Sequence, residues 1–295
     1  MNRVNPRVDI IFKKLFGVEQ NKDLLIALIN SIVSDEDQIA DLSLLNPYNP
    51  QNFLNDKLSI LDIKAQGIDG KRFNIEMQIT DSADYDKRAL YYWAKLYTEQ
   101  LKSGDDYDQL NKAIGIHILN FYSVTDSDKY HNCFHITEKS SGQRYFKDLE
   151  LHTIELKKFP AGNSQALSEL VANIKNSLDI WVAFLTKYDL LSKDQLPREL
   201  NWQPIQKALS ELEIMNFSET ERYAYEDHLK WLRDEASTLK KSFEDGKEEG
   251  REEGIEQATL AIARLMLSKN KPIEEIIEFT NLPLELIQKL KSESQ

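Results

Sequence analysis

Two acidic residues in consecutive β-strand patterns are the part of this sequence best suited to chemistry. Asp62 lies in residues 58–66 and Glu76 in residues 72–79, and apolar and polar residues alternate in both runs. Each predicted strand therefore has one apolar and one polar face. The segment between them, residues 67–70, ends in Asp-Gly, which is typical of a hairpin turn. The polar face would carry Asp62, Lys64, Glu76 and Gln78.

The length of the turn decides whether the two acids meet. A two-residue turn would set Asp62 opposite Met77, whereas a three-residue loop that ends at Gly70 would set it opposite Glu76. We expect the three-residue loop, because it keeps the apolar residues of both strands on one face. Opposed residues lie about 5 Å apart at Cβ, and two like charges at about 4 Å repel by roughly 4 kcal/mol. A divalent cation would relieve this repulsion, and oxygen ligands suit Mg²⁺ or Mn²⁺.

Five motifs, taken in order, give the chain a wider resemblance. They are the opening Asp9–Gly17, the strand Leu61–Ala65, the strand Asn74–Gln78, the helical Arg88–Gln100 and the strand Ala113–Leu119. Together they resemble the Rpn family of recombination-promoting nucleases and transposases, a branch of the PD-(D/E)XK nuclease superfamily. The resemblance covers about residues 5–160, and more loosely the rest of the chain.

The resemblance implies a metal-dependent DNA endonuclease that hydrolyses phosphodiester bonds and is associated with DNA recombination or mobile elements. Asp62 and Glu76 match the metal ligands of the family, and Gln78 stands at its third catalytic position, where lysine is commoner. A neutral amide can orient a water by hydrogen bonds but adds no charge. Lys64, on the same predicted face, is a candidate for supplying that charge. The alternative is that the hairpin acids form an ordinary solvated surface.

Two further residues are auxiliary candidates. Asp9 lies on a predicted helix over residues 8–16, and related nuclease folds often place an acid from this helix near the metal; alternatively, it only complements the helix dipole. Arg88 lies on a predicted helix over residues 85–102 and can hold a phosphate with two hydrogen bonds.

Helices and strands alternate over the first half of the chain. Helices are predicted over 8–16, 22–33 and 85–102, and strands follow at 113–122, 134–137 and 149–156. This order predicts an α/β fold, a restriction-endonuclease-like core with a mixed central sheet flanked by helices. An all-helical C-terminal region follows, with helices over 164–187, 203–212, 218–241 and 244–267. We expect a nuclease-like domain over 1–160, a helical region over 161–241 and a helical C-terminal segment over 242–295.

The C-terminal segment holds two features of its own. Gly246, Gly250 and Gly254 recur every four residues, and they indicate either a close helix approach, as between subunits, or a flexible charged linker. Two short helices that flank Thr280-Asn281 resemble a helix-turn-helix. The outer face of the second helix is poor in base-reading side chains, so packing, partner binding or homo-oligomerisation is favoured over DNA reading.

Charge limits the mode of DNA binding. The 295-residue chain has a net charge of −12, which counts against a simple nucleic-acid binder. Residues 1–102, however, carry 13 Lys and Arg against 15 Asp and Glu, a balance of −2. A local groove would form if one face collects the basic residues of this part: Arg3, Arg7, Lys13, Lys14, Lys64, Lys71, Arg72, Lys87 and Arg88.

Cysteine content and hydropathy indicate the compartment. The single cysteine, Cys133, excludes a disulfide framework and offers no Cys/His cluster for zinc, and the five histidines show no repeated metal spacing. No apolar run is long enough to span a bilayer, and the N-terminus lacks a signal peptide's apolar region. We therefore expect a cytoplasmic protein with no membrane partner.

Two alternatives to the endonuclease stay open. One is a catalytically decayed DNA-binding or regulatory and assembly protein of the same fold, which the neutral Gln78 and the acidic charge favour. The other is a transcriptional regulator that acts through the C-terminal helices.

Overall fold

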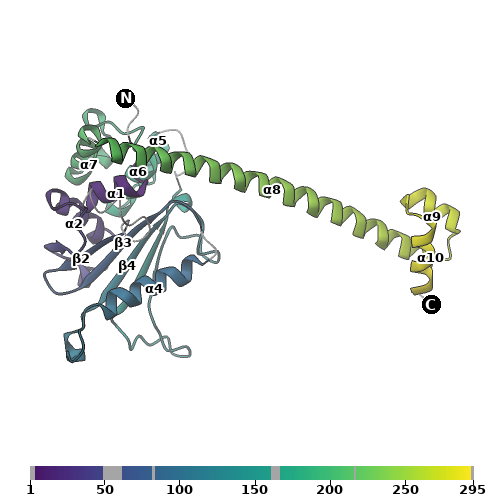
Figure 1. Cartoon of the computed structure of the whole chain (residues 1–295), viewed down its shortest axis with the longest axis horizontal. Helices are drawn as coiled ribbons and strands as arrows, with labels where there is room; N and C mark the ends of the chain where they lie inside the picture. Colours follow the sequence, from purple (N-terminus) through teal and green to yellow (C-terminus); the bar gives the residue numbers. More distant parts are fainter. Residues whose placement is uncertain (1–3, 49–61, 82–83, 161–166, 216, 294–295) are drawn as a thin grey trace. The chain divides into compact units, whose positions relative to one another are not determined.

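The chain divides into two compact units, Met1–Leu229 and Lys230–Gln295 (Figure 1). The structure, a computed structural model, describes residues 4–48, 62–81, 84–160, 167–215 and 217–293. The first unit carries the predicted site residues.

A six-stranded mixed sheet forms the centre of the first unit. Its strands, in spatial order, are β1 (Leu42–Leu44), β2 (Ile63–Gly67), β3 (Arg72–Gln78), β4 (Ala113–Leu119), β6 (Leu149–Glu155) and β5 (His131–Phe134). The pairs β3–β4 and β4–β6 are parallel, and the other pairs are antiparallel. The parallel pair β3–β4 is joined across α4 (Tyr85–Thr98), since parallel neighbours need a long crossover. This architecture confirms the predicted restriction-endonuclease-like α/β fold.

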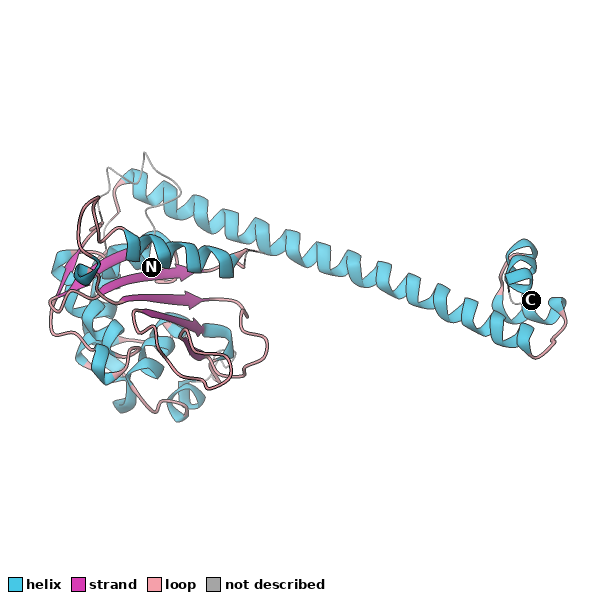
Figure 2. Cartoon of the chain, turned by 90° about the horizontal axis from the view of Figure 1, so that it is seen from below, coloured by secondary structure: helices cyan, strands magenta, loops and turns pink. Residues whose placement is uncertain are grey.

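Helices cover both faces of the sheet (Figure 2). One face of the inner strands is a row of buried apolar residues that packs against α1 (Asp9–Phe16), α2 (Lys22–Asn30), α6 (Ser177–Lys187) and α7 (Gln203–Ile214). The other face lies against α4, whose Tyr85 and Ala89 form a smaller apolar cluster with Leu119 and Phe121. Alternate residues of each strand therefore belong to different layers.

The β2–β3 hairpin has the predicted register. Ile63 pairs with Ile75 and Ala65 with Phe73, and all four side chains are fully buried. The Gly67 amide donates to the Lys71 carbonyl, which leaves residues 68–70 as a three-residue loop. Its last residue, Gly70, has φ of +87°, which L side chains rarely adopt. The two-residue turn is thereby excluded.

Several predicted boundaries were wrong. The predicted strand over 134–137 is β5, which ends at Phe134, and the short edge strand β1 was not predicted. Residues 58–61 of the predicted strand over 58–66 lie outside the described part of the chain. The helix predicted over 164–187 is two helices, α5 (Leu167–Ala172) and α6, with residues 161–166 outside the described part. The two helices predicted over 218–241 and 244–267 are one helix, α8 (Glu219–Ser268), because no helix-breaking residue separates them.

The second unit is helical. The last turns of α8 pack with α9 (Ile273–Thr280) and α10 (Leu284–Glu293) around four buried residues: Ala263, Ile276, Ile287 and Leu290. Asn281 ends α9 in the left-handed conformation, which supports the predicted pair of short helices. The three glycines lie within α8. If a Cβ atom were added to any of these glycines, no neighbouring atom of the described residues would lie within 4 Å of it.

Among the described helices, none combines the length and apolar character needed to cross a bilayer.

Gly70→Ala is expected to destabilise the first unit by about 1–3 kcal/mol, because the residue would hold a strained φ and its Cβ would stand 2.7 Å from Asn111 Oδ1. Gly104→Ala is the matched control, since Gly104 also has a positive φ (+98°) but an open surrounding. Urea unfolding followed by tryptophan fluorescence measures both. Equal losses in the two variants would contradict the tight packing of the turn.

Candidate active site

Asp62 lies one residue before β2, and its backbone is held from two sides. The Asp62 carbonyl accepts hydrogen bonds from Lys13 Nζ of α1 at 3.0 Å and from Asn46 Nδ2 at 3.1 Å. Asn46 Oδ1 also accepts from the Lys64 amide at 2.7 Å. Because Ile63 pairs with Ile75, the same register continued by one residue sets Asp62 across from Glu76.

Glu76 lies on β3, on the face of the sheet that α4 covers. Its Oε1 is 3.2 Å from an Arg88 Nη2 of α4, and its Oε2 is 3.5 Å from Nδ1 of His117. His117 is directly opposite Glu76 in the parallel β3–β4 register and is only 2% exposed. The predicted residue Arg88 therefore does lie at the site, where it contacts the carboxylate.

The electrostatics connect Asp9 to the same place. Burial and the negative charge of Glu76 raise the pKa of Asp9 to about 7. Burial also raises the pKa of Asp62; the positive charges of Lys13 and Lys64 lower it, and the charge of Glu76 raises it further. Three acids from α1, the start of β2 and β3 thus share one electrostatic environment, in which an additional cation would favour their charged forms.

The two remaining predicted residues have partners elsewhere. Gln78 follows Glu76 on the same face of β3, and its Nε2 donates to the Thr80 carbonyl at 3.2 Å. Lys64 Nζ lies 3.1 Å from Glu99 Oε2 at the end of α4. The ammonium of Lys64 is therefore neutralised in part by an acid that was not predicted as a site residue.

Three neighbours of the acids were not predicted as active-site residues, although Lys13 was among the basic residues of the predicted groove. Lys13 is 2% exposed, and burial lowers its pKa to about 8. The sequence feature that could have identified Lys13 is its position within an apolar helical segment, where a lysine is unusual. His117 lies inside an apolar strand, and neither of its ring nitrogens has a hydrogen-bond partner within the described residues. The buried Tyr85 hydroxyl, whose ring packs edge-on against His117 at 5.8 Å, likewise has none there.

These orphaned polar atoms bear on what the site can hold. Buried polar groups are nearly always hydrogen-bonded, so partners outside the protein chain, such as water or a bound ligand, are expected beside Glu76. The carboxylates of Asp9, Asp62 and Glu76 are oxygen donors of the kind that Mg²⁺ and Mn²⁺ prefer. The type of donor atom therefore suits a hard divalent cation, whereas among the described residues these three acids do not form a group whose ligand atoms all lie within 4.8 Å of one another.

The predicted basic groove is not a set of free cations. Five of its nine residues form ion pairs with acids: Lys14 with Glu221, Lys64 with Glu99, Lys71 with Asp69, Lys87 with Asp84, and Arg88 with Glu76. Arg3 lies outside the described residues. Local acids thus compensate much of the positive charge around the site.

A mixed sheet between two helical layers, with acids at the start of β2 and on neighbouring β3, defines a protein of the PD-(D/E)XK nuclease class. The comparison with protein families agrees. Residues 6–242 match the model of the PD-(D/E)XK nuclease family transposases, and the chain belongs to this family. The match confirms the predicted relationship and indicates a nuclease- or transposase-related role. No curated protein and no solved structure gives a significant match.

Asn46→Ala is expected to destabilise the first unit by about 1–3 kcal/mol, because it removes the hydrogen bonds to the Asp62 carbonyl and from the Lys64 amide. Gln38→Ala, which removes one exposed contact to Asp35, is the control and should change stability by less than about 0.5 kcal/mol. Chemical denaturation measures both. An Asn46→Ala variant as stable as wild type would argue against this anchoring of Asp62.

Proposed function

We propose that this chain is a metal-dependent DNA endonuclease that hydrolyses phosphodiester bonds during DNA recombination or the movement of mobile elements. The observation that carries the proposal is the convergence of Asp9, Asp62 and Glu76 in a chain of a nuclease family. A cytoplasmic location and assembly of identical chains through the C-terminal helices belong to the same proposal.

Asp62 and Glu76 would hold the metal, with Asp9 as a further oxygen donor. When bound, Mg²⁺ or Mn²⁺ supplies stabilisation of the charge on a scissile phosphate and lowers the pKa of a bound water. The residues around the acids then have positioning roles. Lys13 and Asn46 fix the backbone of Asp62, and Arg88 fixes one oxygen of Glu76.

Gln78 occupies the position at which lysine is commoner in the superfamily pattern. Its amide can orient a water that approaches the phosphate, but it cannot add positive charge there. Lys13 is the better-placed cation, because it is buried against Asp62 while Lys64 is paired with Glu99. We assign Gln78 to water orientation and Lys13 to charge compensation.

DNA binding by this site should be modest and strongly dependent on salt. Several cations of the predicted groove are already paired with acids, so few remain to displace counterions from the phosphates. The expected affinity therefore falls as ionic strength rises, and binding that is tight at high salt would contradict the proposed mode of recognition.

Asp62→Asn and Glu76→Gln are each expected to lower Mg²⁺-dependent nicking of supercoiled plasmid by at least about 100-fold, because each removes a metal ligand worth several kcal/mol in the transition state. Asp69→Asn changes an acid of the same hairpin that lies in its turn and binds Lys71, and it should retain activity. Nicking that persists unchanged in both ligand variants would overturn the site assignment.

Gln78→Lys is expected to raise the nicking rate about 10-fold or more, since a cation at this position adds electrostatic stabilisation that a neutral amide lacks. Gln78→Met, of similar volume, should lower the rate because it cannot hydrogen-bond to water. Initial rates at saturating Mg²⁺ measure both. Gln78→Met as fast as wild type would exclude the orienting role.

One observation favours the decayed alternative. Arg88 Nη2 lies 3.2 Å from Oε1 of Glu76, so the protein itself satisfies one oxygen of this carboxylate without a metal. A chain that binds DNA equally well with Mg²⁺ or EDTA, and nicks it with neither, would establish the alternative over the endonuclease.

A further inference from the structure

The opposite face of the sheet gathers a second group of polar side chains. On β5, His131 and Cys133 are two residues apart and so lie on one face, and His135 follows in the same phase one residue beyond the strand. On β6, Glu150 and His152 alternate in the same way, and Cys133 pairs directly with His152. Five residues with metal-binding side chains therefore face one another across a single antiparallel pair.

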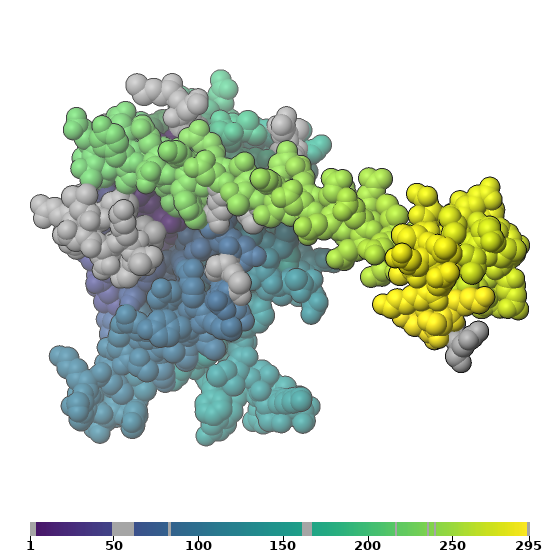
Figure 3. Space-filling view, turned by 45° about the vertical axis from the view of Figure 1, so that its right-hand side comes forward, coloured from purple at the N-terminus to yellow at the C-terminus, as the bar shows by residue number. Residues whose placement is uncertain are grey.

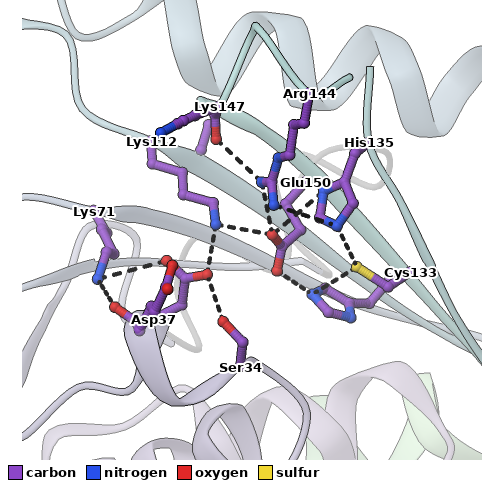
Figure 4. Close-up of polar contacts among 12 residues, drawn as sticks. Ser34, Asp37, Lys71, Lys112, Cys133, His135, Arg144, Lys147 and Glu150 are labelled. Carbon is purple, nitrogen blue, oxygen red and sulfur yellow. Dashed lines mark hydrogen bonds and ion pairs between the residues drawn. The ribbon is translucent and has the colours of Figure 1, made fainter. Parts of the chain in front are cut away.

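The donor atoms of this group are close together (Figure 4). Cys133 Sγ lies 3.5 Å from His135 Nε2 and 3.9 Å from His152 Nε2, and His152 Nε2 lies 2.8 Å from Glu150 Oε1. One ligand atom each from Cys133, Glu150 and His152 fall within 4.8 Å of one another. In a tetrahedral zinc site, bond lengths of about 2.3 Å to sulfur and 2.0–2.1 Å to nitrogen set S···N separations of about 3.6 Å.

We propose that Cys133, Glu150 and His152 form a zinc site, and that the His135 imidazole, whose Nε2 lies 3.5 Å from Cys133 Sγ, turns toward them to supply the fourth ligand. A thiolate and two imidazoles select zinc over Mg²⁺ or Ca²⁺, whose preferred ligands are oxygens. The sequence had indicated that Cys133 offers no Cys/His cluster. That inference was wrong, because the residues that meet belong to two segments, Cys133 and His135 at β5 and Glu150 and His152 on β6, which are neighbours in the sheet but show no metal-binding spacing in the sequence.

The surrounding contacts leave the metal-facing atoms of Glu150 and His152 available. Lys112 Nζ at 2.8 Å and Arg144 Nη2 at 3.1 Å both bind Oε2 of Glu150, so Oε1 is the oxygen directed at His152. His152 Nδ1 lies 2.9 Å from His131 Nε2. Hydrogen bonds of this kind to the far atoms of ligands orient metal sites in general.

Charge around the group is balanced enough to accept a dication. Lys112 also binds Asp37 at 2.5 Å, and Asp37 lies 3.6 Å from Lys71, so these cations have acids besides Glu150. Arg144 Nη1 lies 3.4 Å from His135 Nε2, and it would give up this contact when that nitrogen binds zinc. A thiolate and a carboxylate together neutralise the added Zn²⁺.

The position of the group indicates a structural role. Glu150 and His152 pair with Ile114 and Ile116, whose side chains belong to the main core, so the group and Glu76 occupy opposite faces of the sheet. Strand β5 is the edge of the sheet, and the loop that follows it projects from the bottom of the first unit, in teal in Figure 3. Zinc would fasten this edge strand and the base of the loop to β6.

Cobalt titration of the full-length, tag-free protein tests the proposal, because Cys133 is the only cysteine in the chain. A thiolate-to-cobalt charge-transfer band can come from no other residue. We expect one equivalent of Co²⁺ to give this band together with tetrahedral d–d absorption, and Zn²⁺ to abolish both by displacement. Saturation with Co²⁺ without the thiolate band would overturn the site.

Variants separate the ligands from the surrounding contacts. Cys133→Ser should abolish the band, and His152→Gln should lower Zn²⁺ affinity at least 100-fold. His131→Phe should lower it about 10- to 100-fold while the band remains, since this residue only supports His152. His228→Gln, a histidine of α8, is the control, and circular dichroism checks the folding of each variant. Unchanged Zn²⁺ affinity in both Cys133→Ser and His152→Gln would also overturn the proposal.

Discussion

The register of the sheet is the constraint on which both polar groups of the first unit depend. The three-residue loop that ends at Gly70 sets the β2–β3 pairing, and the parallel β3–β4–β6 pairing carries the same alternation across the sheet. A slip of one residue would exchange the faces of every side chain in a strand. Glu76 would then point into the apolar core and Ile75 toward α4. The buried row of Ile, Phe and Met side chains opposes that slip.

The candidate active site contains buried and half-buried ionisable side chains, and burying such groups costs free energy. Burial and the charge of Glu76 raise the pKa of Asp9 and of Asp62, and burial lowers the pKa of Lys13 beside them. Two polar side chains at the same place, Tyr85 and His117, lack hydrogen bonds within the described residues. Such local costs are concentrated at functional sites, and the large helical core on the other face of the sheet offsets them.

Local patterns in the sequence predicted the hairpin well but not its surroundings. The alternation of apolar and polar residues and the Asp-Gly turn were sufficient to predict the register. Only one register buries the apolar residues of both strands on the same face. Lys13, Asn46 and His117 were missed since their importance comes from contacts across long stretches of sequence. The same is true of Cys133 and His152, which no motif spacing connects. The predicted ends of helices were wrong where no proline or other helix-breaking residue marks an end, as in α8, which was predicted as two helices.

Metal binding between Asp62 and Glu76 is the central claim of this account. Anomalous diffraction from a crystal of the wild-type protein soaked in Mn²⁺ tests it most directly, because it locates the ion without relying on activity. The account predicts a peak about 2.0–2.3 Å from carboxylate oxygens of both Asp62 and Glu76. Both carboxylates ordered in the electron density with no peak between them, at a Mn²⁺ concentration that supports nicking, would contradict it.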